Sequence, residues 1–199
     1  IGEDGSSQIG LEDISLFRTI LNSVVLYPSD AVATEKLVEE AAKHKGIVYI
    51  RTTRQATPTL YNDKENFEIG GSKTLKSSDN DVVTVVSAGI TLYEALSAQE
   101  ELVKKNINVR VIDLYSIKPI DISTLELAAR QTKAIITVED HYAEGGLGEA
   151  VQSALARQII PVYSLAIKNM PKSGKPRELL NYEEISKNAI IKKIKEVIK

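Results

Sequence analysis

Two arginines follow a short apolar run in the first half of the chain. The sequence IVYIRTTR places Arg51 and Arg54 directly after residues typical of a buried strand. Ligands of open α/β sheets bind beyond the carboxyl ends of the strands, and the forked guanidinium donors of arginine match phosphate and carboxylate groups. The pair could therefore hold an anionic substrate. The alternative is a surface pair bonded to local acidic residues, and the residues alone leave both interpretations open.

A second set of polar residues lies in the sequence VEDHYAEGGLGEA. Glu139, Asp140 and His141 follow an apolar strand, and such a group could transfer protons or bind a metal ion. Neighbouring strand residues point to opposite faces, however, which argues against one shared site. The glycines within 145–148 could cradle a phosphate at a helix N-terminus, but their spacing matches neither a P-loop nor a dinucleotide fingerprint. We therefore favour a structural role, a tight turn into a helix with His141 hydrogen-bonding the loop.

The chain begins with a glycine-bearing loop that precedes an expected helix. In the sequence IGEDGSSQIG, the carboxylate of Asp4 could hydrogen-bond a substrate hydroxyl, and Gln8 lies four residues further on. The residues alone favour an ordinary turn acid or helix cap at Asp4. The basic loop Pro171–Pro176 is likewise expected to be a plain surface loop rather than a phosphate contact.

Strand and helix patterns alternate on both sides of these residues. Residues 11–22 and 29–46 have helical apolar spacing, and the short apolar runs 24–28 and 47–50 predict two strands. A strand–helix–strand order favours parallel pairing with a right-handed crossover. This part of the chain therefore predicts two parallel strands joined by a helix.

The remaining chain divides into a polar stretch and a longer apolar one. Residues 56–80 are rich in Asn, Asp, Lys, Ser and Gly and are interpreted as a linker, with a short strand around Phe67–Ile69. Residues 81–199 alternate apolar strands with amphipathic helices and end in a helix expected over Tyr182–Lys199. The predicted fold class is α/β, with two open, mostly parallel sheets flanked by helices.

Composition excludes several classes of chemistry. The 199 residues include no cysteine, which excludes disulfides, thiolate catalysis and cysteine-bound zinc. The net charge of −2 and the absence of a long apolar run predict no nucleic-acid partner, no membrane span and a cytoplasmic protein. The only methionine is Met170, so Ile1 is not an initiator and we expect further sequence upstream.

Taken in order, several motifs resemble the transketolase family in its animal-type form. The resemblance runs from Ile1 to about Lys199 and rests on the sequences GEDGSSQIGLEDISLFR, YPSDAVATEKLVEEAAKHKGIVYIRTTR, IKPIDISTL, VEDHYAEGGLGEAV and SGKPRELL. It implies that residues 1–55 are the C-terminal part of a pyrimidine-binding domain that is truncated at its N-terminus. It further implies a linker over 56–80 and a complete C-terminal domain over 81–199.

The resemblance also implies an activity and a set of site residues. Transketolases use thiamine diphosphate, with Mg or Ca, to move a two-carbon ketol unit between sugar phosphates in the pentose phosphate pathway, and they act as homodimers. By matching position, Asp4 would bind a hydroxyl of the donor sugar, Arg54 would bind the sugar phosphate, and Gln8 would lie near the cofactor. The family's catalytic glutamate and its diphosphate and metal site fall upstream of Ile1. This chain alone is therefore expected to bind no cofactor and to be inactive.

Two alternatives remain open at this point. Related thiamine-diphosphate enzymes, namely the β subunit of the 2-oxo-acid dehydrogenases and deoxyxylulose-phosphate synthase, share the same pair of domains. The DGSSQ loop together with RTTR favours transketolase over these relatives. The other alternative is a non-catalytic dimerisation or regulatory module.

Overall fold

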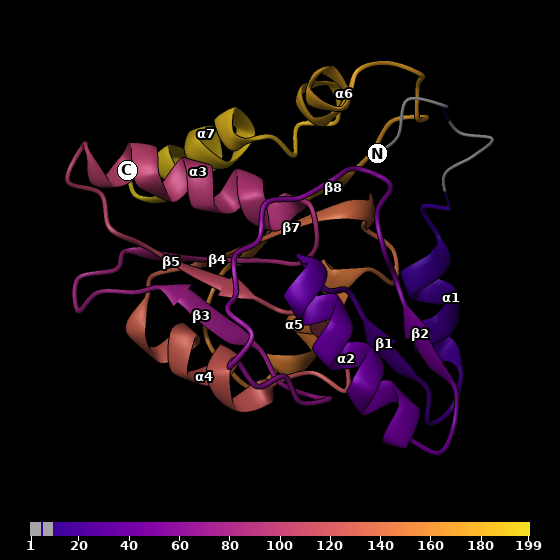
Figure 1. Ribbon diagram of the computed structural model, residues 1–199. Coiled ribbons are helices and arrows are strands. Elements are labelled where there is room, and N and C mark those ends of the chain that lie inside the picture. Colours follow the sequence, from indigo (N-terminus) through magenta and orange to yellow (C-terminus); the bar gives the residue numbers. More distant parts are fainter. Residues whose placement is uncertain (1–4, 6–9) are drawn as a thin grey trace.

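The computed structural model describes residue 5 and residues 10–199. Two sheets are surrounded by helices, as Figure 1 shows, and the elements of the first half of the chain supply two strands of the smaller sheet and its cover. These elements are α1 (Asp13–Thr19), β1 (Val24–Leu26), α2 (Ala31–Lys43) and β2 (Val48–Ile50).

The remaining elements build the larger sheet and its two helical layers and supply the third strand of the smaller sheet. The strands are β3 (Lys73–Lys76), β4 (Val83–Ser87), β5 (Val109–Asp113), β6 (Ser116–Lys118), β7 (Ile135–Tyr142) and β8 (Val162–Ile167). The helices are α3 (Thr91–Val103), α4 (Ile122–Gln131), α5 (Leu147–Ala154), α6 (Pro176–Tyr182) and α7 (Lys187–Val197).

The smaller sheet has the strand order β2-β1-β6. Strands β1 and β2 are parallel and are joined by α2, as the sequence predicts. Asp30 begins that helix, because its side chain accepts a hydrogen bond of 2.7 Å from Ala33 N. The third strand, β6, follows β5 in the chain and pairs with β1 in antiparallel fashion. A segment from the second half of the chain therefore completes the sheet of the first half.

The larger sheet has the order β3-β5-β4-β7-β8. Its pairs are parallel except for β3, which is antiparallel to β5, so the predicted class of mostly parallel α/β sheets is confirmed. Strand β3 lies at Lys73–Lys76 rather than around Phe67–Ile69. The ring of Phe67 instead packs edge-on against those of Tyr61 and Tyr115, with centroids 4.9 Å away in each case. Burial of this ring, and not strand pairing, explains the apolar signal there.

Helices cover both faces of the larger sheet, as Figure 1 shows. One face packs against α3 and α7, and their buried contacts include Leu92, Leu102, Ile190 and Ile194. The other face packs against α4 and α5. The same apolar cluster continues into Ile14, Val25 and Tyr27 of the smaller sheet and its helix α1, so the two sheets share a core.

The C-terminal region contains two helices where one was expected over Tyr182–Lys199. Helix α6 ends at Tyr182 and α7 begins at Lys187. Between them Glu184 has a φ of 54°, a left-handed conformation that does not continue a helix. The turn allows Leu180 of α6 and the isoleucines of α7 to be buried together. Within the described part of the chain, no helix is long and apolar enough to cross a membrane.

Candidate functional site

Arg51 lies at the end of β2, and its side chain is buried against two aspartates. Its Nε is 3.2 Å from Asp13 Oδ2, and its Nη1 is 3.4 Å from Asp140 Oδ1. Its Nη2 also donates a hydrogen bond of 3.0 Å to the backbone oxygen of Asp140. The guanidinium lies 4.9 Å from the centre of the Tyr27 ring. These contacts join β2, α1 and the end of β7 in one buried cluster.

The charges of this cluster hold each other in the ionised form. Burial acts to lower the pKa of Arg51, but Asp140 and the neighbouring acidic groups outweigh it and raise that pKa. Burial acts to raise the pKa of Asp140, but Arg51 and a hydrogen bond of 3.1 Å from the Tyr27 hydroxyl lower it. Arg51 is only 8% exposed and its donors already face carboxylates. The interpretation of Arg51 as a substrate anion site is therefore wrong, and its bonding to nearby acids is buried rather than superficial.

Glu139 occupies the N-terminus of α5, where a phosphate could otherwise bind. Its carboxyl accepts hydrogen bonds from Leu147 N at 2.6 Å and from Gly148 N at 2.8 Å. A Cβ at Gly146 would overlap this carboxyl group, so the close approach requires a glycine there. Burial raises the pKa of Glu139 to about 8, although the two backbone donors act to lower it. The glycine run is thus a turn into a helix that is capped by the protein's own side chain.

His141 also has a structural role, although its partner differs from the predicted one. Its Nε2 accepts a hydrogen bond of 3.3 Å from Ser15 N, and its Nδ1 lies 2.6 Å from the backbone oxygen of Tyr142. The two contacts fit a neutral ring with the proton on Nδ1, and burial lowers the pKa of this histidine. The glycine loop is bonded instead by Arg18, which donates to the carbonyls of Gly145 and Gly146.

The three neighbours 139–141 therefore contact three different elements and form no common site. In the described ranges, no group of three or more His, Cys, Asp or Glu side chains could hold a metal ion. What the three residues share is that each one fastens the end of β7 to a helix or strand.

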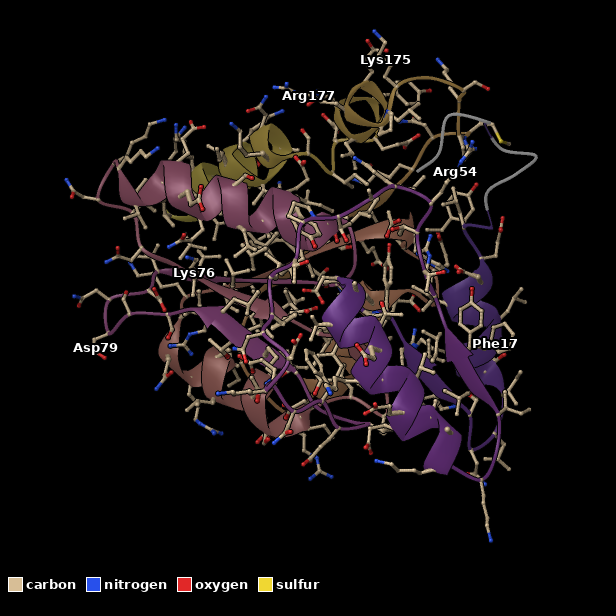
Figure 2. All side chains as sticks on the ribbon, viewed as in Figure 1. Phe17, Arg54, Lys76, Asp79, Lys175 and Arg177 are labelled. Atoms are coloured by element: carbon tan, nitrogen blue, oxygen red, sulfur yellow. The ribbon has the colours of Figure 1, made fainter. Side chains whose placement is uncertain are left out.

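Arg54 differs from Arg51 because its side chain is exposed. Figure 2 shows it at the upper right of the view, towards the end of the molecule where Lys175 and Arg177 also lie. Asp4 and Gln8 lie outside the described residues. Gly5 is described, and a Cβ at this position would be 2.6 Å from Ser173 Oγ. The structure thus separates the two arginines of the RTTR motif into a buried and an exposed one.

A further acidic cluster was not anticipated from the sequence. Asp113, at the end of β5, is fully buried and accepts a hydrogen bond of 2.6 Å from the Tyr61 hydroxyl. The Ser29 hydroxyl lies 3.0 Å from each of its carboxyl oxygens. Burial raises the pKa of Asp113 to about 7, and the nearby charge of Asp30 acts in the same direction. The only feature of the sequence that could have indicated this cluster is Asp113 itself, an aspartate that directly follows the apolar run VRVI.

The pKa of Asp113 predicts a stability that depends on pH. The folded value of about 7 is above the ordinary 3.8, so the unfolded chain loses this proton first as the pH rises. The stability that protonated Asp113 contributes to the folded state is fully present below about pH 4 and is lost as the pH rises through 7. In urea unfolding, Asp113→Asn should flatten the fall in unfolding free energy between pH 4 and pH 8 by on the order of 4 kcal/mol.

The matched control for this measurement is Asp79→Asn, because Asp79 is an exposed aspartate remote from the cluster. It should leave the pH profile of the wild-type protein unchanged. If the unfolding free energies of the wild type and of Asp113→Asn change with pH in parallel, Asp113 has the same pKa in the folded and the unfolded chain, which would contradict the prediction.

Two family models match the chain. The model described as "Transketolase, C-terminal domain" matches residues 72–190, and the model described as "Transketolase, pyrimidine binding domain" matches residues 1–59. The transketolase of Homo sapiens is 50% identical over 200 residues, which cover 100% of this chain and 32% of that protein. Transketolase-like protein 1 of Macaca fascicularis is 51% identical over 197 residues, covering 98% and 33%. The chain thus spans about a third of the length of these relatives.

Solved structures give the same result. One described as "Split gene transketolase, inactive beta4 tetramer" is 34% identical, with a TM-score of 0.88 over 96% of this chain and 62% of that one. The transketolase of Campylobacter jejuni has a TM-score of 0.79 over 98% of this chain and 29% of that one at 19% identity, which shows a shared fold. Because the C-terminal family model alone matches more than half of its residues, this chain belongs to the transketolase family.

Proposed function

We propose that this chain forms the end of the pyrimidine-binding domain and the C-terminal domain of a transketolase. The reaction is the transfer of a two-carbon ketol unit from a ketose phosphate to an aldose phosphate, in the pentose phosphate pathway. The observation that carries the proposal is Arg54, an exposed arginine just beyond the carboxyl end of a parallel strand. The proposed division is 1–55, 56–80 and 81–199, with the middle part as a linker that also contributes strand β3 to the larger sheet.

The proposed cofactor is thiamine diphosphate with Mg or Ca, which supplies the electron sink for carbon–carbon bond cleavage when it is bound. Gln8 is the residue of this chain that would contact it. The described residues offer no carboxylate or histidine cluster for its metal ion. We therefore assign the diphosphate and the metal to the part of the longer relatives that this chain does not match.

Two residues of this chain would act on the substrate itself. Asp4 would orient a hydroxyl of the donor sugar, and Arg54 would bind the phosphate at the far end of the substrate. Binding energy from a remote phosphate can be used to hold the reacting carbon in place. Arg51 supports Arg54 without contacting substrate, since its own charge is already paired with Asp13 and Asp140.

The proposed setting is a cytoplasmic homodimer that acts on sugar phosphates. A related structure, 34% identical, is described as an inactive tetramer of a split-gene transketolase, which supports the view that such a part is inactive by itself.

We expect the 199-residue chain to transfer no ketol unit, even with thiamine diphosphate and Mg²⁺ added. The catalytically complete enzyme that contains it should be active in the same assay. The assay follows a phosphorylated ketose donor and an aldose phosphate acceptor. Activity of the chain alone would contradict the assignment of the catalytic groups to other sequence.

Arg54→Ala should raise KM for phosphorylated sugars strongly in the complete enzyme, because a charge-assisted contact to the phosphate is lost. We expect a rise of about 10- to 100-fold, corresponding to roughly 1.5–3 kcal/mol. KM for an unphosphorylated donor should change by less than about two-fold, because no phosphate is bound.

The control is Arg177→Ala, which removes another exposed positive charge at the same end of the molecule. It should change KM little for both the phosphorylated and the unphosphorylated donor. An equal rise in KM of Arg54→Ala for the phosphorylated and the unphosphorylated donor would contradict the role of Arg54 in binding the phosphate.

A further inference from the structure

The segment 51–61, which we call the anchored segment, carries Arg54 between two fixed ends. At its start, Arg51 is paired with Asp140, which belongs to β7. At its end, the backbone N–H groups of Leu60 and Tyr61 donate to Asp30 Oδ2 at 2.7 and 3.0 Å. An exposed loop of this length would otherwise be mobile, so these ties restrict where Arg54 can lie.

Two further ties come from the larger sheet and its helix α3. The hydroxyl of Tyr93, in α3, lies 2.7 Å from the backbone oxygen of Pro58 and 2.7 Å from that of Ser29. The hydroxyl of Tyr61 donates 2.6 Å to Asp113, in β5. Figure 1 shows the corresponding course of the chain, which leaves β2 and passes the end of α3 before it turns towards β3.

Asp30 and Asp13, which also hold the anchored segment, belong to the first part of the chain, but three further elements that hold it lie in the range matched by the C-terminal family model. These are β7 with Asp140, α3 with Tyr93 and β5 with Asp113, within residues 72–190. The Tyr61–Asp113 contact is enclosed, since Tyr61 is 6% exposed and Asp113 0%. A hydrogen bond to a carboxyl group in such surroundings is stronger than one at the surface, and its loss leaves a buried carboxyl short of a donor.

We propose that Tyr61, Tyr93 and Asp113 are positioning residues for Arg54, through which the C-terminal domain sets the specificity for phosphorylated sugars. They contact no substrate and act by fixing the segment that carries the guanidinium. This inference rests on the proposed function of Arg54. It assigns a role in substrate selection to a domain that contributes no described catalytic group.

Tyr61→Phe is the sharpest test, because it removes the hydroxyl and keeps the ring that packs 4.9 Å from Phe67. In the complete enzyme we expect KM for a phosphorylated ketose to rise about three- to ten-fold, the equivalent of one buried hydrogen bond. The values of kcat and of KM for an unphosphorylated donor should stay within about two-fold. Tyr93→Phe should likewise raise KM for the phosphorylated ketose.

Tyr115→Phe is the matched control. Tyr115 lies in the same aromatic cluster and its buried hydroxyl accepts a hydrogen bond of 3.3 Å from Glu68 N, outside the anchored segment. A purely structural effect of losing a tyrosine hydroxyl would appear in this variant too. The inference is overturned if Tyr115→Phe and Tyr61→Phe raise KM equally, or if Tyr61→Phe lowers kcat for both donors alike.

Hydrogen exchange on the 199-residue chain gives a readout that needs no activity. The amides of Leu60 and Tyr61 should exchange faster in Tyr61→Phe and unchanged in Tyr115→Phe, and equal exchange in all three proteins would contradict the tie. A complete wild-type enzyme that lacks ketol transfer would refute the proposed function. An active wild type with an unshifted Tyr61→Phe would refute the positioning role alone.

Discussion

The buried pairing of Arg51 with Asp140 and Asp13 is the constraint on which the remaining structure depends. A charged guanidinium is costly to remove from water unless carboxylates face it, so its burial fixes three elements relative to one another. Those elements are the end of β2, the first turn of α1 and the end of β7. Because one belongs to the larger sheet and two to the smaller part, the ion pairs hold the two halves in a single arrangement.

The larger sheet uses its carboxyl edge for internal contacts. In open α/β sheets this edge is where ligands bind, yet here the carboxylates of Asp113 and Asp140, near the ends of β5 and β7, already have partners. Asp113 is bonded by Tyr61 and Ser29, and Asp140 by Arg51 and Tyr27. Gly89, two residues after β4, has a φ of 57°, and a side chain there would overlap the Tyr27 ring. This edge therefore packs against residues within 1–59, the range matched by the pyrimidine-binding family model.

Much of the architecture follows from patterns in the sequence. The parallel pair β1–β2 and the alternation of β4, α3, β5, α4 and β7 are evident because continuous apolar strands and amphipathic helices have distinct periods. Strand β6 has no such signal, since three residues pair with a strand far away in sequence. The turn at Glu184 could not be predicted either, because apolar residues continue on both sides of it.

The site was predictable in residue type and only partly in role. The spacing in RTTR indicates an anion site but cannot distinguish a buried arginine from an exposed one, because the partners of Arg51 lie 38 residues before it and 89 after it. Tyr61 and Asp113 were missed because nothing local relates them. Asp4, Gln8 and the sugar-phosphate role of Arg54 rest on the resemblance of whole motifs, and they remain predictions.

A double-mutant cycle on Arg51→Met and Asp140→Asn, read by urea unfolding of this chain, tests the central claim most directly. Each single change should cost about 3–5 kcal/mol, because it leaves a buried charge without its partner. The double variant should cost little more than either one, giving a coupling energy of at least about 2 kcal/mol. Costs that add within about 0.5 kcal/mol would contradict the claim that this pair locks the two halves together.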